Sequence, residues 1–270
     1  MHRLLLIVSL VLAGCSVPPT ALPPAPAALP ATTDTLAPTT PPTPIAPAKN
    51  TWIPLFAGAE VLETADGFTA VRHFPTAVVY ESHFESDPEQ GKQISEWLDA
   101  SDRALVAVNC GFYWEKNSAY QHMGLLMVNG ENWSELRANW GGVLIVREGQ
   151  AFIASQPERL LAPATLGLQG WPMLMQSRIA VSQLDDHDLA RRTAVGIDGH
   201  GRLVWVVATD AITLAAFAQR LLKTDLDLVT AVNLDGGISS GLRWRAGVEE
   251  TQVGPNSLPV PCAIRFGPIA

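Results

Sequence analysis

The sequence predicts an α+β fold: one domain built on a mostly antiparallel mixed β-sheet, with a few helices packed on it. Three observations support this. Short apolar and β-branched runs of strand length recur along the chain, and turn dipeptides separate several of them. Helical periodicity is confined to two short stretches. Together these features are typical of hairpin-rich sheets rather than of alternating strand and helix units.

The strands are expected where apolar runs lie between turn residues. Asn129-Gly130 and Glu148-Gly149 stand where a hairpin turn requires positive φ, which predicts antiparallel pairs rather than crossovers. A third hairpin is expected across residues 198–201, Asp-Gly-His-Gly. The predicted strands are residues 68–73, 77–80, 104–109, 124–128, 142–146, 151–154, 194–197, 203–208, 230–233 and about 261–266.

Two helices are expected. The first covers residues 93–98, and the second begins after Thr213, whose hydroxyl is a typical helix N-cap. Its apolar residues fall on one stripe at helical spacing, which indicates core packing rather than a ligand site. The stripe consists of Leu214, Phe217, Ala218, Leu221 and Leu222.

The first 14 residues have the form of an export signal. Arg3 precedes the apolar run 4–12, which is too short to cross a bilayer about 30 Å thick at about 1.5 Å per residue. Residues 12–15, Leu-Ala-Gly-Cys, resemble the lipobox of bacterial lipoproteins. We therefore expect residues 1–14 to be cleaved and Cys15 to carry a lipid. The protein would then be anchored outside the cytoplasm, on the cytoplasmic membrane's outer face, the outer membrane or the cell surface.

Residues 15–49 are expected to be a disordered tether, because they consist almost entirely of Pro, Ala, Thr and Leu. An extended proline-rich chain of this length reaches roughly 100 Å at ~3.1 Å per residue. A proline-rich recognition ligand is the alternative interpretation. Residues 50–270 contain neither a second linker nor a repeat, and they are expected to form one domain.

Charge and cysteine content limit the partners. The formal net charge of −8 argues against nucleic acid, which requires clustered Lys and Arg, and favours a small molecule or a glycan. If Cys15 is lipidated, Cys110 and Cys262 remain, and in an oxidising compartment they are able to pair. The sequence leaves this pairing open.

Two segments share one design: an apolar strand ends in asparagine, and glycine follows closely. They are residues 107–112, Ala-Val-Asn-Cys-Gly-Phe, and residues 231–240, Ala-Val-Asn-Leu-Asp-Gly-Gly-Ile-Ser-Ser. Glycines at strand ends allow backbone N–H groups to approach a ligand, and such sheet ends are common binding sites. Tight turns satisfied by their own Asn and Asp side chains are the alternative.

The second segment resembles the Asn-Leu-Asp-Gly-Gly-x-Ser-Ser signature of the phosphodiester glycosidase family. Three further pieces follow the family's order: residues 109–112 resemble Asn-Gly-Gly-Phe, residues 171–174 resemble Gly-Pro-x-Leu, and residues 192–197 resemble Arg-Thr-Ala-x-Gly. The resemblance runs from about residue 52 to the C-terminus. Cys110 and Trp171 stand where the family has glycine, so the fit of the substrate beside Cys110 is open to question. A Cys110–Cys262 disulfide would make the first departure structural.

The resemblance implies hydrolysis of a sugar-1-phosphodiester to free sugar and a phosphomonoester. Arg192 would bind the phosphate through its planar guanidinium. Asp235 would activate water or stabilise an oxocarbenium-like centre. The leaving group is already anionic and needs little protonation. No cofactor is implied, although Ca or Mg at Asp235 stays open. The candidate substrate-binding residues are Asn109, Gly111, Phe112, Thr193, Asn233, Gly236, Gly237 and Ser239.

Each of these roles has a structural alternative. Arg192 is able to form an ordinary surface ion pair, Asp235 an Asx turn, and Ser239 a helix cap. His122 is either an additional acid/base or a loop residue, and we favour the loop. Asp198 is interpreted as a hairpin residue. Residues 185–188, Asp-Asp-His-Asp, lack the spacing of a calcium loop and are expected to be a solvated loop.

Two other functions compete with this hydrolase. One is a glycan-binding envelope lipoprotein without activity, and the other is a metal-dependent phosphodiesterase, for which a clustered ligand set is lacking. Several tryptophans in predicted loops or strand ends, Trp114, Trp133, Trp140 and Trp171, either stack on sugar rings or serve packing.

Overall fold

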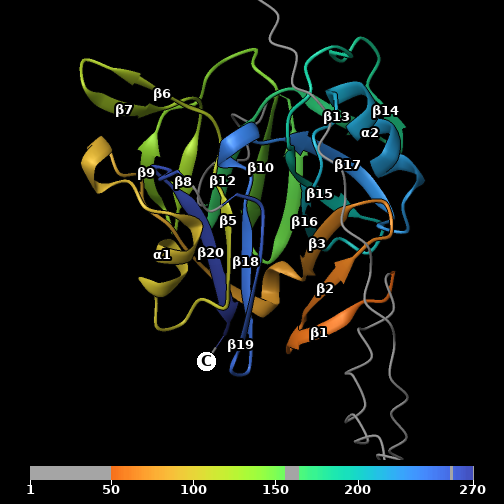
Figure 1. Cartoon of the computed structure of the whole chain (residues 1–270), viewed down its shortest axis with the longest axis horizontal. Helices are drawn as coiled ribbons and strands as arrows, with labels where there is room; N and C mark the ends of the chain where they lie inside the picture. Colours follow the sequence, from red (N-terminus) through yellow and green to blue (C-terminus); the bar gives the residue numbers. More distant parts are fainter. Residues whose placement is uncertain (1–49, 156–163, 256–257, 270) are drawn as a thin grey trace, which may run out of the picture. The chain divides into compact units, whose positions relative to one another are not determined.

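The structure, a computed structural model, describes residues 50–155, 164–255 and 258–269 (Figure 1). The predicted signal peptide, Cys15 and the predicted tether lie outside these residues. All strand pairings in the described ranges are antiparallel, which confirms the expectation of a mostly antiparallel fold. The described ranges contain two α-helices, α1 (Ile94–Asp99) and α2 (Leu214–Lys223).

The largest sheet has eight strands, and the predicted hairpin across residues 198–201 lies at its centre. Its strands at residues 53–56, 59–63 and 179–180 were not predicted, because they are short and only partly apolar. In spatial order the strands are β1 (Ile53–Phe56), β2 (Ala59–Glu63), β3 (Phe68–His73), β16 (Leu203–Ala208), β15 (Thr193–Asp198), β17 (Leu228–Asn233), β13 (Met173–Gln176) and β14 (Ile179–Ala180).

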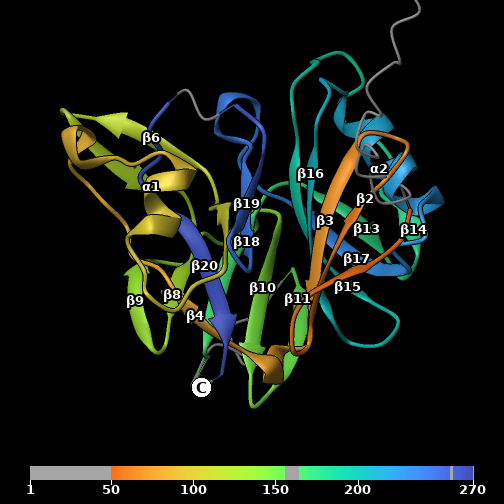
Figure 2. The same ribbon diagram turned by 60° about the horizontal axis from the view of Figure 1, so that its bottom comes forward.

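Two further sheets have five strands each, and the two-stranded hairpin β6 (Tyr113–Lys116) and β7 (Ala119–His122) stands apart from them. Figure 2 shows the five-stranded sheets beside the eight-stranded one. The first consists of β11 (Gln150–Ala154), β10 (Gly142–Arg147), β12 (Leu166–Gly170), β8 (Leu126–Val128) and β9 (Glu131–Ser134). The second consists of β19 (Glu249–Val253), β18 (Leu242–Ala246), β5 (Val106–Asn109), β20 (Ala263–Pro268) and β4 (Val78–Glu81).

One apolar cluster joins the three sheets. Trp205 of the eight-stranded sheet, Leu144 of β10 and Phe266 of β20 are each fully buried within it. The opposite face of the eight-stranded sheet is covered by α2, and α1 packs Trp97 against the second five-stranded sheet. Burial of such side chains from water is the main stabilising contribution to the fold.

The local turn and cap signals are confirmed. Asn129 and Gly130 have φ of 52° and 81°, and Glu148 and Gly149 have φ of 52° and 73°, as two-residue hairpin turns require. The Thr213 side chain accepts a hydrogen bond from the Ala216 N–H at 3.2 Å.

One sequence-based expectation is corrected, and a further strand was missed. Leu222 is 40% exposed and lies outside the buried stripe of α2. Strand β12 was not predicted, because its Leu-Gly-Leu-Gln-Gly sequence has weak strand propensity. Its Gly170 is required by packing, because a Cβ there would lie 2.2 Å from the carbonyl oxygen of Asn233.

No helix within the described ranges is both long and apolar enough to span a bilayer.

Candidate active site

Asn109, the last residue of β5, holds two distant segments together. Its Oδ1 accepts hydrogen bonds from the Thr193 hydroxyl at 2.9 Å and from the Gly241 N–H at 3.1 Å. Its Nδ2 donates to the carbonyl oxygens of Asp235 at 2.8 Å and Cys110 at 3.3 Å. With these four bonds the amide is fully used.

Asn109 and Thr193 were expected to contact substrate, but they are buried beneath the surface. Asn109 is 1% exposed and Thr193 is fully buried. Their polar atoms are satisfied by each other and by the backbone, so neither offers a group to a ligand in this conformation. They position the Asp235 segment against β5 and β15.

Asp235 follows β17 and carries a carboxyl group with a perturbed acidity. Burial raises the pKa of Asp235 from 3.8 to about 6, and hydrogen bonds from the Ser239 side chain and the Gly236 N–H act in the opposite direction. The Gly236 N–H donates to Oδ1 at 2.8 Å. A carboxyl with this pKa exchanges protons near neutral pH, as acid–base catalysis requires.

The two glycines after Asp235 fit the loop tightly against the chain preceding β15. A Cβ on Gly236 would lie 2.9 Å from the Arg191 carbonyl oxygen, and the Gly237 N–H donates to that same oxygen at 2.7 Å. Gly237 has φ of 64°, which favours glycine. Because both N–H groups are used within the chain, these glycines shape the loop rather than present free donors.

Tyr113 belongs to this site, and sequence reasoning did not identify it. Ser239, in the short 3₁₀ helix Gly237–Ser239, hydrogen-bonds through its side chain with both Tyr113 and Asp235. Burial raises the pKa of Tyr113, so its phenol stays protonated and able to donate. The available signal was position, since Tyr113 directly follows the 109–112 motif.

Asp235, Ser239 and Tyr113 lie between two spaces. On one side is a narrow crevice that is too small to admit a water molecule, which Gly111 and both cysteines also line. On the other side is an open groove of about 500 Å³, here called the Asp235 groove. It is lined by Tyr113, Trp114, Glu115, Tyr120, Asp235, Gly236, Ile238, Ser239, Leu258 and Pro259.

Arg192, which directly precedes β15, is not among the residues that line the Asp235 groove. Its Nε donates to the Ile212 carbonyl oxygen at 3.0 Å and its Nη2 to that of Asp188 at 2.5 Å. Burial lowers the pKa of Arg192, and Asp185 and Asp188 raise it. Within the described ranges its other three N–H groups have no hydrogen-bond partner, so the guanidinium keeps donors for an anion.

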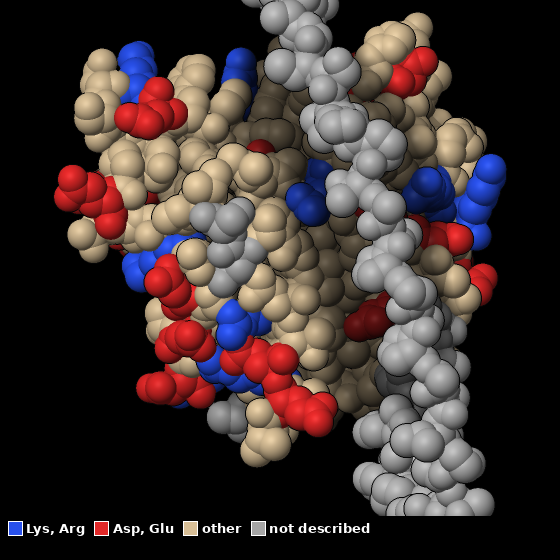
Figure 3. All heavy atoms as spheres, in the orientation of Figure 1, with Lys and Arg blue, Asp and Glu red and all other residues tan. Residues whose placement is uncertain are grey.

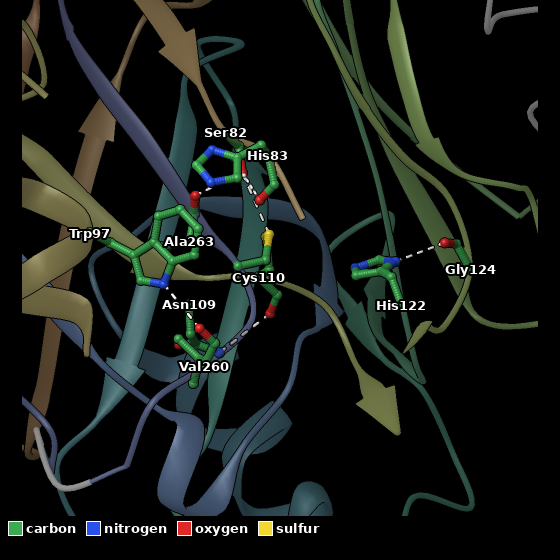
Figure 4. The surroundings of a disulfide bond; sticks show 10 residues. Ser82, His83, Trp97, Asn109, Cys110, His122, Gly124, Val260 and Ala263 are labelled. Carbon is green, nitrogen blue, oxygen red and sulfur yellow. Dashed lines mark hydrogen bonds between the residues drawn. A yellow bond between two sulfur atoms is a disulfide. The ribbon is translucent and has the colours of Figure 1, made fainter. Parts of the chain in front are cut away.

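The cysteines form a disulfide, which settles the pairing that the sequence left open. Cys110 and Cys262 are buried, with their Cα atoms 5.5 Å apart, and they join the end of β5 to the residue before β20 (Figure 4). The substitution of Cys110 at a family glycine is therefore structural. Gly111, beside it, is required because a Cβ there would lie 2.8 Å from the Gln169 carbonyl oxygen.

Two other residues that were predicted to bind substrate, Phe112 and Asn233, contact neighbouring tryptophans. Phe112 packs edge-on against Trp140, with ring centroids 5.7 Å apart. The Asn233 Nδ2 donates to the Trp171 carbonyl oxygen at 2.8 Å, while its buried Oδ1 has no partner in the described part of the chain. Trp171 is 47% exposed.

His122 ends strand β7 and does not lie in the predicted loop. Its Nδ1 lies 2.8 Å from the Gly124 carbonyl oxygen, and burial lowers the pKa of His122 to about 4. Trp114 and Trp133, expected in loops or at strand ends, are the second residue of β6 and the third residue of β9. Strand pairing, not local composition, places these three residues.

Two acidic segments behave as local structure. Asp198 accepts the backbone N–H groups of His200 and Arg202, each at 2.9 Å, which confirms its hairpin role. Residues 185–188 form an exposed loop in which the Asp185 side chain accepts the Asp188 N–H at 2.9 Å. Among the described residues, no group of three or more His, Cys, Asp and Glu side chains is arranged to hold a metal ion.

Charge is distributed unevenly over the molecule. On the face seen in Figure 3, most Asp and Glu side chains lie along the left and lower parts of the domain, and some Lys or Arg side chains lie near the middle beside the grey atoms. The residues that line the Asp235 groove include two carboxylates, Glu115 and Asp235, and no Lys or Arg.

We expect Asn109→Ala to destabilise the fold and displace Asp235. The change leaves the Thr193 hydroxyl, the Gly241 N–H and the Asp235 carbonyl without partners, at about 1–3 kcal/mol for each buried group. Urea denaturation should show a loss of about 3 kcal/mol or more in the free energy of unfolding. Asn132→Ala, at an exposed asparagine of β9, is the control and should change it by less than about 0.5 kcal/mol. Equal losses in both variants would contradict the assigned role of Asn109.

Comparison with known proteins adds independent information. A family model described as phosphodiester glycosidase matches residues 102–265. No curated protein sequence gives a significant match.

Three solved structures share the fold. A hypothetical protein from Synechocystis has a TM-score of 0.62 at 16% identity, over 82% of this chain and 64% of that one. The zebrafish N-acetylglucosamine-1-phosphodiester alpha-N-acetylglucosaminidase catalytic domain, auto-inhibited by its pro-peptide, has a TM-score of 0.53 at 16% identity, over 75% and 78%. A protein of Burkholderia pseudomallei described as exported has a TM-score of 0.54 at 12% identity, over 78% and 74%. The present chain spans just under two thirds of the Synechocystis protein.

Proposed function

The chain belongs to the phosphodiester glycosidase family, and on that premise we propose that it is an exported hydrolase that cleaves sugar-1-phosphodiester bonds in envelope or extracellular glycans. The observation that carries the proposal is the Asp235 carboxyl, whose pKa burial raises to about 6 at the wall of an open groove. The name of the zebrafish relative describes the same reaction class.

In the proposed reaction the ionised Asp235 acts on a water molecule. As the water oxygen bonds to C1 of the sugar, Asp235 accepts the water proton. The bond between C1 and the phosphate oxygen breaks, and its electron pair stays on that oxygen. The products are free sugar and a phosphomonoester. Because the leaving oxygen belongs to an anionic phosphate, a positive charge near it is more important than an acid.

Arg192 is the proposed source of that charge. Its side-chain Cδ lies 3.9 Å from where a Cβ on Gly236 would stand, so its stem passes directly beside the Asp235 loop. The guanidinium has unused N–H donors in the described structure, and Arg binds phosphate oxygens through pairs of such donors. The Tyr113 phenol is a further donor next to Asp235.

The function is tested with a small panel of sugar-1-phosphodiesters and the full-length protein, with release of free sugar as the readout. We expect turnover of at least one member. Arg192→Ala should reduce kcat/KM by about 10- to 100-fold, as loss of a charge-assisted phosphate contact does. Arg191→Ala is the matched control, because the neighbouring Arg191 side chain is exposed and bonds the Thr209 carbonyl.

The alternative, a glycan-binding protein without activity, is favoured by one observation: no Lys or Arg lines the groove. Glycan binding without any release of sugar by the unmodified protein would establish that alternative and reject the hydrolase.

For localisation, we propose an envelope lipoprotein anchored through Cys15, with residues 15–49 as the tether. The support is the run of residues 4–15, a short apolar stretch that ends in Leu-Ala-Gly-Cys. Fractionation of cells that express Cys15→Ser tests it, since an unaltered membrane association of that variant would reject the anchor.

A further inference from the structure

One wall of the Asp235 groove is formed by the β6–β7 hairpin. Glu115 pairs directly with Tyr120 across the two strands, and Tyr113 lies two residues before Glu115, so these three side chains share one face; Trp114, which alternates to the other face, also lines the groove. The Tyr113 and Tyr120 rings meet edge to face, with centroids 5.0 Å apart. The neighbouring Lys116 alternates to the opposite face and does not line the groove.

The opposite wall supplies apolar surface. Ile238 follows the Gly236-Gly237 pair and is 56% exposed, and Leu258 is 47% exposed. Both line the groove with Pro259. A space of about 500 Å³ between tyrosine rings and aliphatic side chains has the size of a small-ligand site.

The polar groups of the groove match the edge of a sugar ring. The Ser239 hydroxyl, the two phenols and the carboxylates of Glu115 and Asp235 are able to accept or donate hydrogen bonds to hydroxyl groups. A pyranose presents C–H groups on its faces and hydroxyls around its edge. Aromatic and aliphatic walls with a few polar groups between them therefore fit such a ring.

The charge of the groove discriminates between sugars. Its lining carries two carboxylates and no Lys or Arg, so an anionic substituent entering there is repelled, while an ammonium group is attracted. Asp235 is assigned to the reaction itself. Glu115 is thus the lining residue whose charge is left for selection.

We propose that the Asp235 groove receives the sugar that the reaction releases, and that Glu115 restricts this sugar to neutral or amine-bearing rings, excluding those that carry a carboxylate, sulfate or phosphate. This inference rests on the proposed hydrolase function, because only that reaction releases a sugar. The phosphodiester lies outside the acidic groove, on the Arg192 side of the Gly236-Gly237 pair.

Equilibrium binding tests the inference without requiring turnover. Glucosamine, glucose and glucuronate share one ring and differ in charge, and their binding to the full-length protein is measured at neutral pH by NMR titration. We expect glucosamine to bind at least as well as glucose, and glucuronate to bind most weakly. Glu115→Gln should narrow the glucosamine-to-glucuronate affinity ratio by about threefold, and Glu115→Lys should invert the preference.

Two controls separate local charge from other effects. Glu249→Gln makes the same charge change at an exposed position of β19 and should leave the affinity ratio unaltered. Raising the salt concentration should shrink the ratio in the unmodified protein, since exposed charges are screened.

The outcomes for the two proposals are distinguishable. Equal binding of the three sugars, or a ratio that Glu115→Lys leaves unchanged, overturns this inference even if the panel of phosphodiesters is hydrolysed. If no phosphodiester is hydrolysed but the three sugars bind in the expected order, the hydrolase function is rejected and the selective sugar site is retained. Hydrolysis of the 1-phosphodiesters of anionic and neutral sugars with equal kcat/KM also overturns this inference.

Discussion

Asp235→Asn should lower kcat/KM for sugar-1-phosphodiester hydrolysis by about 10²- to 10⁴-fold, the range that loss of a general acid–base group produces. The amide keeps the shape of the side chain and an oxygen that accepts the Gly236 N–H, so the loop is expected to stay in place. Asp225→Asn, at an exposed aspartate after α2, makes the same charge change and should have little effect.

The pH dependence of the unmodified protein should report the same group. Burial raises the pKa of Asp235 to about 6, and the proposed reaction uses the ionised form. As the pH falls below about 6, kcat/KM should decrease by about tenfold per unit. A profile that is flat down to pH 4, or an Asn variant that retains most of the activity, would remove Asp235 from the reaction.

Asp235→Asn, although it lowers activity, should not lower the free energy of unfolding at pH 7. The folded chain binds the Asp235 proton more tightly than the unfolded chain, because the pKa of Asp235 is about 6 in the fold against 3.8 in the unfolded chain. The ionised carboxylate therefore opposes folding at pH 7, and this effect fades as the pH falls through 6 toward 4. Asp235→Asn should be at least as stable as the parent at pH 7, with no advantage near pH 4. A strongly destabilised variant would show that lost activity reflects misfolding.

Removal of the Cys110–Cys262 disulfide should strongly lower the free energy of unfolding. The bond closes 152 residues of chain, and cross-links of that span restrict the unfolded state enough to contribute about 3–5 kcal/mol. The Cys110→Ala, Cys262→Ala double variant should therefore unfold roughly 10 °C lower in a calorimetric scan. The native strands stay paired without the bond, because β5 and β20 are already hydrogen-bonded neighbours.

Reduction of the unmodified protein provides the companion measurement, since it removes the bond without altering side-chain volume. It should reproduce most of the loss seen in the double variant. The two cysteines also line the narrow crevice next to Asp235, so kcat is expected to fall in both cases. An unchanged midpoint of thermal unfolding in the reduced protein would mean that the disulfide does not stabilise the fold.

Part of the site could be predicted from sequence and part could not. The 109–112 and 233–240 motifs led to the correct strand ends, because a strand that runs into glycine has a local signal. Arg192 was chosen because residues 192–197 resemble the family's Arg-Thr-Ala-x-Gly motif, and the direction of its guanidinium depends on carbonyl groups of Asp188 and Ile212. Tyr113 was missed, because its partner Ser239 is distant in the sequence.

Local rules therefore determined the hairpin turns at Asn129-Gly130 and Glu148-Gly149, the cap at Thr213 and the antiparallel character of the sheets. These depend on φ preferences and on periodicity over a few residues. The tertiary structure alone decided that Asn109 bonds Thr193, 84 residues away, and the Asp235 backbone, 126 residues away. It also decided that the cysteines pair and that Glu115 and Asp235 share a groove that no Lys or Arg lines. Such contacts arise when sheets pack face to face, and no short stretch of sequence specifies which side chains then meet.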